Sequence, residues 1–90
     1  MRVTTMRKID ALRLKFGDVI EFAETARSYG LPTMMGAVRE LTPRGGIRVR
    51  DLCSGVLSWV PYHHAIRRIR RAAEPITETE RMYASGLQAW

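Results

Sequence analysis

The alternation of hydrophobic and polar residues is clearest in the middle of the chain. In the run IRVRD at 47–51, every second residue is apolar, so the isoleucine and valine are predicted to face a core while the two arginines face solvent. The preceding run GAVREL at 36–41 also has strand character. Between them, TPRGG at 42–46 combines a proline, which presets φ, with glycines that accept positive φ. These residues predict a β-hairpin.

Further strands are predicted on both sides of this hairpin. The run LRLKF at 12–16 alternates apolar and basic residues, and VIEF at 19–22 resumes after a Gly-Asp pair with β-branched and aromatic residues. Residues 23–35 contain a glycine and a proline and are expected to form a long loop. The run VLSWV at 56–60 reads as another strand, which ends at Pro61 because proline has no N–H to donate.

The segment AIRRI at 65–69 has two interpretations. Its isoleucines are three positions apart and would share one helical face, or Ile66 is the inward residue of a short last strand. We favour a single tight turn at 61–64 followed by that strand. Short strands joined by Gly/Pro turns in so short a chain predict a small barrel, which leaves no sheet edge exposed.

The C-terminal residues predict a short helix. After Pro75, Thr77 and Glu80 have the spacing of a capping box, and Gly86 is a plausible helix stop. We therefore expect a helix of about two turns, which either docks on the barrel or frays. The side chains expected to dock are Met82, Leu87 and Trp90.

The length of 90 residues fits one domain with a single modest core. We expect an N-terminal arm at 1–11, a barrel at 12–71 and a tail at 72–90. No apolar run approaches the roughly 20 residues of a membrane helix, and no secretory signal is evident at the N-terminus. The single cysteine, Cys53, excludes an internal disulfide framework and suits a reducing compartment, so a cytoplasmic location is expected.

The net charge of +6 is concentrated in one part of the sequence. Residues 39–71 carry eight arginines against two carboxylates and net +6, whereas residues 1–38 net +2 and residues 72–90 net −2. Arginine is suited to bidentate contacts with phosphate or carboxylate. This asymmetry favours a polyanionic partner.

Three runs together resemble the SH3-like small barrels. KFGDVIEF at 15–22 is similar to their first strand, GAVRELTPRGGIRVRD at 36–51 to their central pair, and WVPYHHAIRRI at 59–69 to their ending. The resemblance covers roughly residues 12–70. It implies a mainly β protein, a five-stranded barrel with a 3₁₀ turn near Pro61.

Within these barrels, the nearest resemblance is to the C-terminal DNA-binding domain of retroviral integrases and to the KOW-type barrels. In those barrels a G-x-V, G-x-x-V and V-P pattern precedes basic residues. The matching positions here are Gly36, Val38, Gly46, Val49, Val60 and Pro61, followed by Arg67 and Arg68. This branch implies nucleic-acid binding, of DNA or RNA. The aromatic cluster of peptide-binding SH3 domains is not found in this sequence.

The first functional hypothesis is therefore a non-enzymatic, basic nucleic-acid-binding module. Arg48 and Arg50 lie about 7 Å apart on one face of a strand. The predicted phosphate contacts are Arg39, Arg44, Arg48, Arg50, Arg67, Arg68, Arg70 and Arg71, with Tyr62 as a stacking residue. Trp59 is expected to pack in the core or semi-buried rather than to stack on a base.

The alternative is a protein–protein interaction module, an accessory subunit or a regulator of the sort mobile elements encode. It would dock on a larger protein or ribonucleoprotein complex through the C-terminal tail and the loop before the hairpin. The residues predicted for that contact are Met34, Met35, Met82, Tyr83, Leu87 and Trp90.

Few residues in the sequence point to a metal site or an active site. His63 and His64 are adjacent, so their side chains diverge, and no CxxC or spaced histidine pair accompanies Cys53. Nothing in the sequence orients either histidine as a base for that thiol. We therefore predict no metal site, no cofactor, no small-molecule substrate and no membrane partner.

Overall fold

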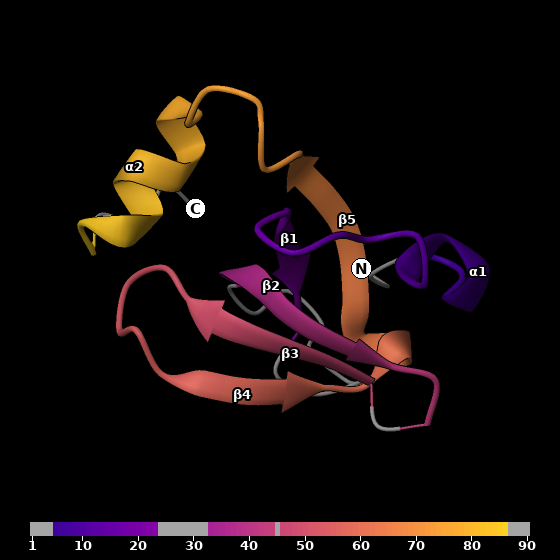
Figure 1. The fold of residues 1–90 in the computed structure, drawn as a ribbon. Helices are drawn as coiled ribbons and strands as arrows, with labels where there is room; N and C mark the ends of the chain where they lie inside the picture. The colour runs from indigo at the N-terminus through magenta and orange to yellow at the C-terminus, as the bar shows by residue number, and fades with distance from the viewer. Residues whose placement is uncertain (1–4, 24–32, 45, 87–90) are drawn as a thin grey trace.

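The structure, a computed structural model, describes residues 5–23, 33–44 and 46–86. Five antiparallel strands form one sheet in the order β4-β3-β2-β1-β5 (Figure 1). The strands are β1 (Val19–Phe22), β2 (Met34–Thr42), β3 (Gly46–Asp51), β4 (Leu57–Val60) and β5 (Ala65–Arg70). The helices are α1 (Lys8–Ala11), the 3₁₀ helix η1 (Tyr62–His64) and α2 (Glu78–Ala84). The predictions of a mainly β protein, a 3₁₀ turn after Pro61 and a short C-terminal helix are confirmed.

The β2–β3 hairpin forms as the alternation predicts. Ile47 and Val49 are fully buried, and Val49 is the register partner of Val38 on β2. Gly46 closes the turn with φ +96°, and a Cβ at this position would lie 2.4 Å from the carbonyl oxygen of Val60. Only glycine fits there, so this residue fixes how closely the hairpin approaches the end of β4.

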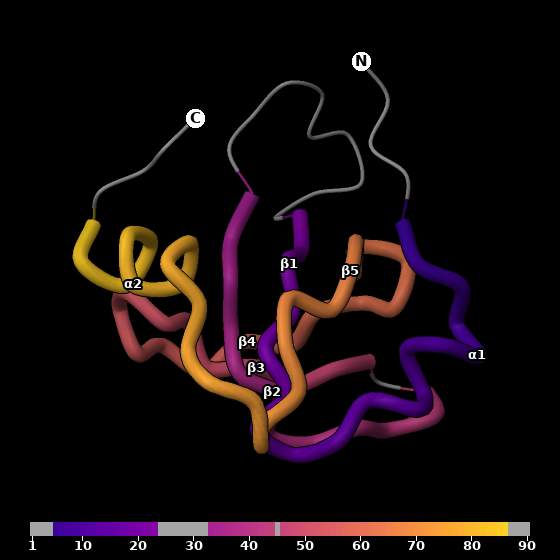
Figure 2. The backbone as a smooth tube through the Cα atoms, turned by 90° about the horizontal axis from the view of Figure 1, so that it is seen from above, coloured from indigo at the N-terminus to yellow at the C-terminus, as the bar shows by residue number. Residues whose placement is uncertain are grey.

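The main core lies on one face of the sheet and includes residues before β1. Its buried members are Ala11, Leu14, Ile20, Phe22, Val38, Ile47, Val49, Val60 and Ala65. A second cluster joins Val19, Met35 and Tyr83. Since Val19 and Ile20 are consecutive on β1, they point to opposite faces, and the second cluster lies on the face away from the main core. Figure 2 shows α1 and α2 on opposite sides of the molecule.

Helix α2 is capped and docked by specific contacts. Thr77 and Glu80 make the predicted capping box, and Gly86 follows the helix with φ +83°. The Tyr83 hydroxyl donates to Asp51 Oδ2 over 2.7 Å. The burial of Tyr83, together with the carboxylate beside it, raises the pKa of its phenol. The docking of α2 on the sheet therefore depends on the buried residues Tyr83 and Glu80. Met82, which was expected to dock the helix, is only half-buried.

The predicted strand at 12–16 is wrong. This segment follows α1 as a turn and an irregular stretch, in which Leu14 is buried while Leu12 and Phe16 are exposed. The Lys15 N–H donates to Asp18 Oδ2 and the Gly17 N–H donates to the Val38 carbonyl. Gly17 has φ +88°, and Lys15 and Asp18 bond to each other across it, so the chain turns here and segment 12–16 does not continue β1 as a strand.

Three smaller predictions also need correction. Strand β2 begins at Met34, so the loop expected at 23–35 ends earlier, and residues 24–32 lie outside the described residues. Ala65 takes the inward position of β5, and Ile66 is only half-buried. Trp59 is 49% exposed, because it lies on the face of β4 opposite Val60, which alone on that strand reaches the core.

Candidate nucleic-acid interface

The exposed face of β3 and β4 carries two arginines beside apolar side chains. Arg48 is the register partner of Trp59, and Arg50 is the partner of Leu57. The Arg48 guanidinium carbon lies 5.9 Å from the Trp59 ring centroid, a cation–π distance. Arg50 is exposed and Arg48 half-buried. Cations and an open aromatic ring therefore lie together on a surface that the core does not use.

Arg39 extends this surface onto β2. The register passes from Val38↔Val49 to Glu40↔Arg48, so Arg39 is the extra residue of a β-bulge. Its guanidinium carbon lies 4.8 Å from the ring centroid of Phe16, which is 65% exposed. Bulges re-aim side chains, and this one directs Arg39 toward the loop before β1. We call Arg39, Arg48, Arg50, Leu57 and Trp59 the sheet-face patch.

A groove of about 750 Å³ lies between that loop and the end of β5. Its basic lining residues are Arg13, Lys15, Arg68 and Arg71, and Phe16 lines it as well. Among the described residues, none of these four basic side chains has an ion-pair partner. We call this set of five residues the basic groove.

The two carboxylates that line the groove are occupied by other groups. Asp10 accepts from Arg7 over 3.0 Å. Asp18 is buried and accepts from the backbone N–H groups of Lys15 and Ala72, each over 3.0 Å. The four basic side chains outnumber the two lining carboxylates, and Asp10 is itself paired with Arg7, so the lining of the groove carries a net positive charge.

The basic groove and the sheet-face patch meet at Phe16. This ring lines the groove and also lies under the Arg39 guanidinium. Arg39 in turn lies at the bulge opposite Arg48. The two surfaces thus form one extended basic path with aromatic rings, Phe16 and Trp59, along it.

Three of the predicted phosphate contacts are engaged within the chain, and the longest of these contacts joins Arg48 Nη1 to Glu40 Oε2 over 3.9 Å. Arg70 is 15% exposed; its Nε donates to both carboxylate oxygens of Glu80 over 2.8 Å. Its Nη1 donates to the carbonyls of Arg71, Ala72 and Glu74. Arg67 Nε lies 2.8 Å from Glu21 Oε1. Arg70 therefore anchors α2, so the prediction that it contacts phosphate is not supported. Arg67 is exposed, but its guanidinium is already paired with the Glu21 carboxylate.

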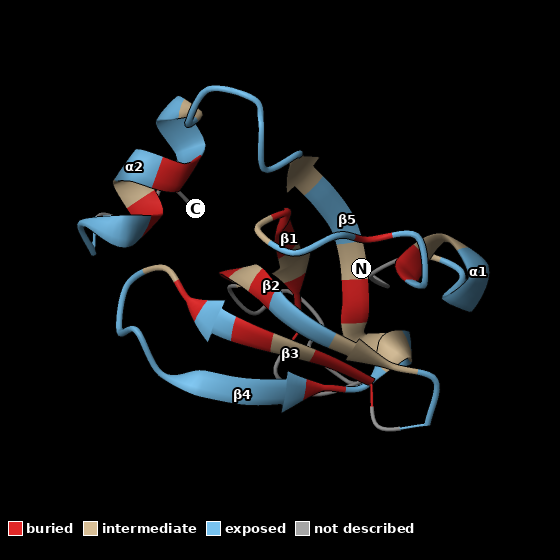
Figure 3. Ribbon diagram, viewed as in Figure 1, coloured by how far each residue is buried: buried red, intermediate tan, exposed pale blue. Residues whose placement is uncertain are grey.

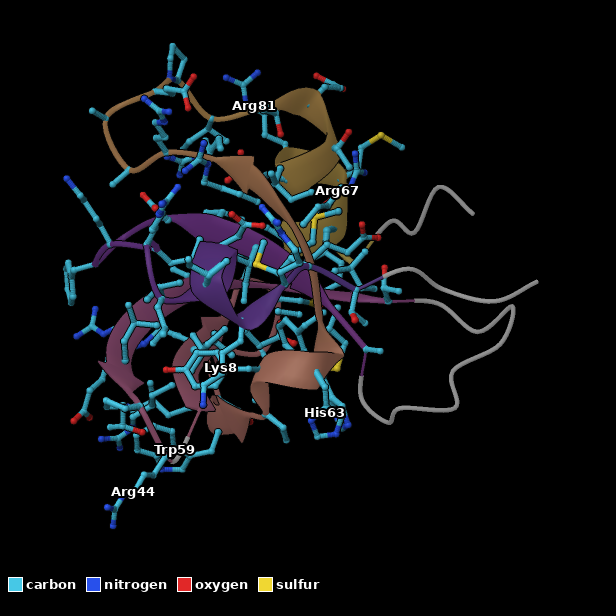
Figure 4. The ribbon with its side chains drawn as sticks, turned by 90° about the vertical axis from the view of Figure 1, so that its right-hand side faces the viewer. Lys8, Arg44, Trp59, His63, Arg67 and Arg81 are labelled. Atoms are coloured by element: carbon cyan, nitrogen blue, oxygen red, sulfur yellow. The ribbon has the colours of Figure 1, made fainter. Side chains whose placement is uncertain are left out.

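Arg44 lies at the Trp59 end of the basic path, far from Arg67, and Tyr62 is partly buried beneath the chain's own backbone. Figure 4 shows Arg44 and Trp59 projecting at one corner of the molecule and Arg67 and Arg81 toward the other end. Tyr62 is half-buried: its hydroxyl donates to the Thr42 carbonyl, and burial raises its pKa more than that bond lowers it. The eight predicted arginines therefore do not share a single face, contrary to expectation.

The predicted partner-binding residues belong largely to the chain's own packing. Met35 and Tyr83 are buried in the second cluster, so a partner cannot reach them while α2 is docked. Met34 and Met82 are half-buried. Leu87 and Trp90 lie outside the described residues.

The histidines and the cysteine form no chemical site within the described part of the chain. No group of three or more His, Cys, Asp or Glu residues there is arranged to hold a metal ion. The rings of His63 and His64 meet edge to face at 4.4 Å, and burial together with His63 lowers the pKa of His64.

Comparison with protein-family models, with curated proteins and with solved structures gives no match. In the described ranges, no helix has the length and apolar character needed to cross a membrane. The function is therefore inferred from the surface itself.

Proposed function

We propose that this chain is a non-enzymatic nucleic-acid-binding module built on an SH3-like barrel. The fold proposal is supported by the antiparallel pairing of β5, the last strand, with β1, the first. It is also supported by η1 between β4 and β5, because the resembling barrels end in a 3₁₀ turn and a short last strand.

One observation carries the functional proposal: the basic groove and the sheet-face patch are continuous through Phe16 and Arg39. Arginine and lysine neutralise phosphates, and exposed rings stack on bases without reading their sequence. Unpaired bases offer their faces for such stacking, which favours a single strand. The proposed ligand is single-stranded nucleic acid, bound with little sequence preference.

A salt titration tests this proposal. The chain is titrated into a fluorescent oligonucleotide of about 12 nucleotides, the site size of small single-strand-binding domains. Four or more phosphate contacts give a slope of log K against log salt concentration of about −3 or steeper. Fluorescence anisotropy at four salt concentrations measures it, with a duplex of the same sequence as the comparison. Absence of binding at the lowest salt concentration, or a slope near zero, would refute the proposal.

A protein-docking module is the second candidate, and strand β4 favours it. Val56, Leu57 and Trp59 are 57%, 40% and 49% exposed, and β4 lies at one end of the strand order. Figure 3 shows this strand exposed over most of its length. Exposed apolar side chains at a sheet edge suit a protein partner. Binding to such a partner would depend far less on salt than binding to phosphates.

A further inference from the structure

A second basic pocket lies beside the basic path, and Met6 lines both this pocket and the groove. It has a volume of about 500 Å³ and is bounded by the start of α1, the β2–β3 turn and η1. Lys8, Arg44 and His63 line it, one from each of these elements, and no described lining residue is a carboxylate. In Figure 4, Lys8 lies between Arg44 and His63. Three residues with basic side chains, one from each element, thus line one cavity.

The floor of this pocket is held in place by the fold. The Tyr62 hydroxyl donates to the Thr42 carbonyl, and the Lys8 ammonium lies 5.6 Å from the Tyr62 ring centroid. The His64 N–H donates to the Pro61 carbonyl over 2.9 Å, which closes η1. The contact of Gly46 with Val60 fixes the turn that carries Arg44. Contacts within the chain therefore hold several of the residues that line the pocket.

We propose that this pocket binds the phosphate monoester of a nucleotide. A monoester carries about −1.5 to −2 charges near pH 7, whereas an internal phosphodiester carries a single charge. A pocket with two cationic side chains, a histidine and no carboxylate among its described lining residues favours the more highly charged group. Pro43, Pro61 and Met6 supply an apolar wall for the attached nucleoside. The inference goes beyond the proposed function, since it uses no residue of the basic groove or the sheet-face patch.

Calorimetric titration of the full chain with adenosine 5′-monophosphate and with adenosine tests the proposal. The monophosphate is expected to bind at least about tenfold more tightly, because it adds charge-assisted hydrogen bonds. The double variant Lys8→Gln, Arg44→Gln is expected to lose this preference. The control Arg81→Gln removes an exposed arginine at the far end of the molecule and should retain it.

A second comparison identifies the source of the monoester. The same oligonucleotide is titrated with a 5′-phosphate and with a 5′-hydroxyl. If the chain prefers the strand with the 5′-phosphate, the pocket binds a strand end. If it prefers only the monophosphate over adenosine and does not distinguish the two strands, the pocket binds a free nucleotide. If neither preference appears, or if either survives in the Lys8→Gln, Arg44→Gln variant, the proposal is wrong. Binding of the 5′-hydroxyl strand reports separately on the proposed function.

Discussion

Reversing Arg48 and Arg50 to glutamate is expected to lower the affinity for the single-stranded oligonucleotide at least about 100-fold. Each reversal removes a charge-assisted contact with phosphate, typically about 1.5–3 kcal/mol, and adds a repulsive charge. The fold should survive, because Arg50 has no ion-pair partner among the described residues and the Arg48–Glu40 contact is long, at 3.9 Å. Exposed contacts of that kind contribute about 0–1 kcal/mol.

Single reversals provide the matched control for this prediction. Arg48→Glu and Arg81→Glu change the net charge equally, but only Arg48 lies in the sheet-face patch. Anisotropy titrations at one salt concentration and thermal unfolding are measured for both. If the two variants lose affinity to the same extent, binding depends on net charge alone and the assignment of the patch fails.

Replacing Glu80 by glutamine is expected to destabilise the chain by about 3 kcal/mol, at the low end of the cost of breaking a buried ion pair. The Glu80 side chain is 3% exposed, and within the described part of the chain its carboxylate is the only one paired with the Arg70 guanidinium. Glutamine can still accept from the Thr77 N–H, so the change isolates the lost charge from the lost cap. Chemical denaturation measures the free energy of unfolding.

The same helix supplies the control. Glu78→Gln removes an exposed carboxylate from the first turn of α2 and should change the free energy of unfolding by less than about 0.5 kcal/mol. Hydrogen exchange should show faster exchange of the α2 amides in Glu80→Gln than in Glu78→Gln, because Glu80 holds the helix on the sheet. Equal stabilities of the two variants would contradict the role given to the Arg70–Glu80 pair.

The elements that were predicted correctly are those set by local chemistry. The alternation at 47–51 and the Gly/Pro turn before it produce the hairpin, and the Thr77–Glu80 capping box starts α2. The strand predicted at 12–16 is wrong because no other strand pairs with this segment, although its apolar and polar residues do alternate. Of its three apolar residues, only Leu14 reaches the core. An alternating run becomes a strand only if the backbone of another segment, distant in sequence, lies beside it to accept its hydrogen bonds. The periodicity of the run itself does not show whether such a segment exists.

The residues of the candidate site could be grouped from the sequence only where they lie on one strand. Arg48 and Arg50 follow from alternation, but the basic groove joins residues 13–16 to Arg68 and Arg71 across the fold. Arg13 and Lys15 were recognisable as the polar side of an alternating run, though not as neighbours of β5. The pairing of Arg70 with Glu80 was equally hidden. One signal was available: Glu80 and Tyr83 are three positions apart, so they share the face by which α2 docks.

Mapping the bound oligonucleotide by amide NMR shifts tests the central claim most directly. With the 5′-hydroxyl strand at low salt, the account predicts the largest shifts at the residues of the basic path, including the Trp59 indole N–H, and small shifts along α2. The residues of that path are Arg13, Lys15, Phe16, Arg39, Arg48, Arg50, Leu57, Trp59, Arg68 and Arg71. Shifts scattered over all surfaces, or concentrated on α2, would contradict it.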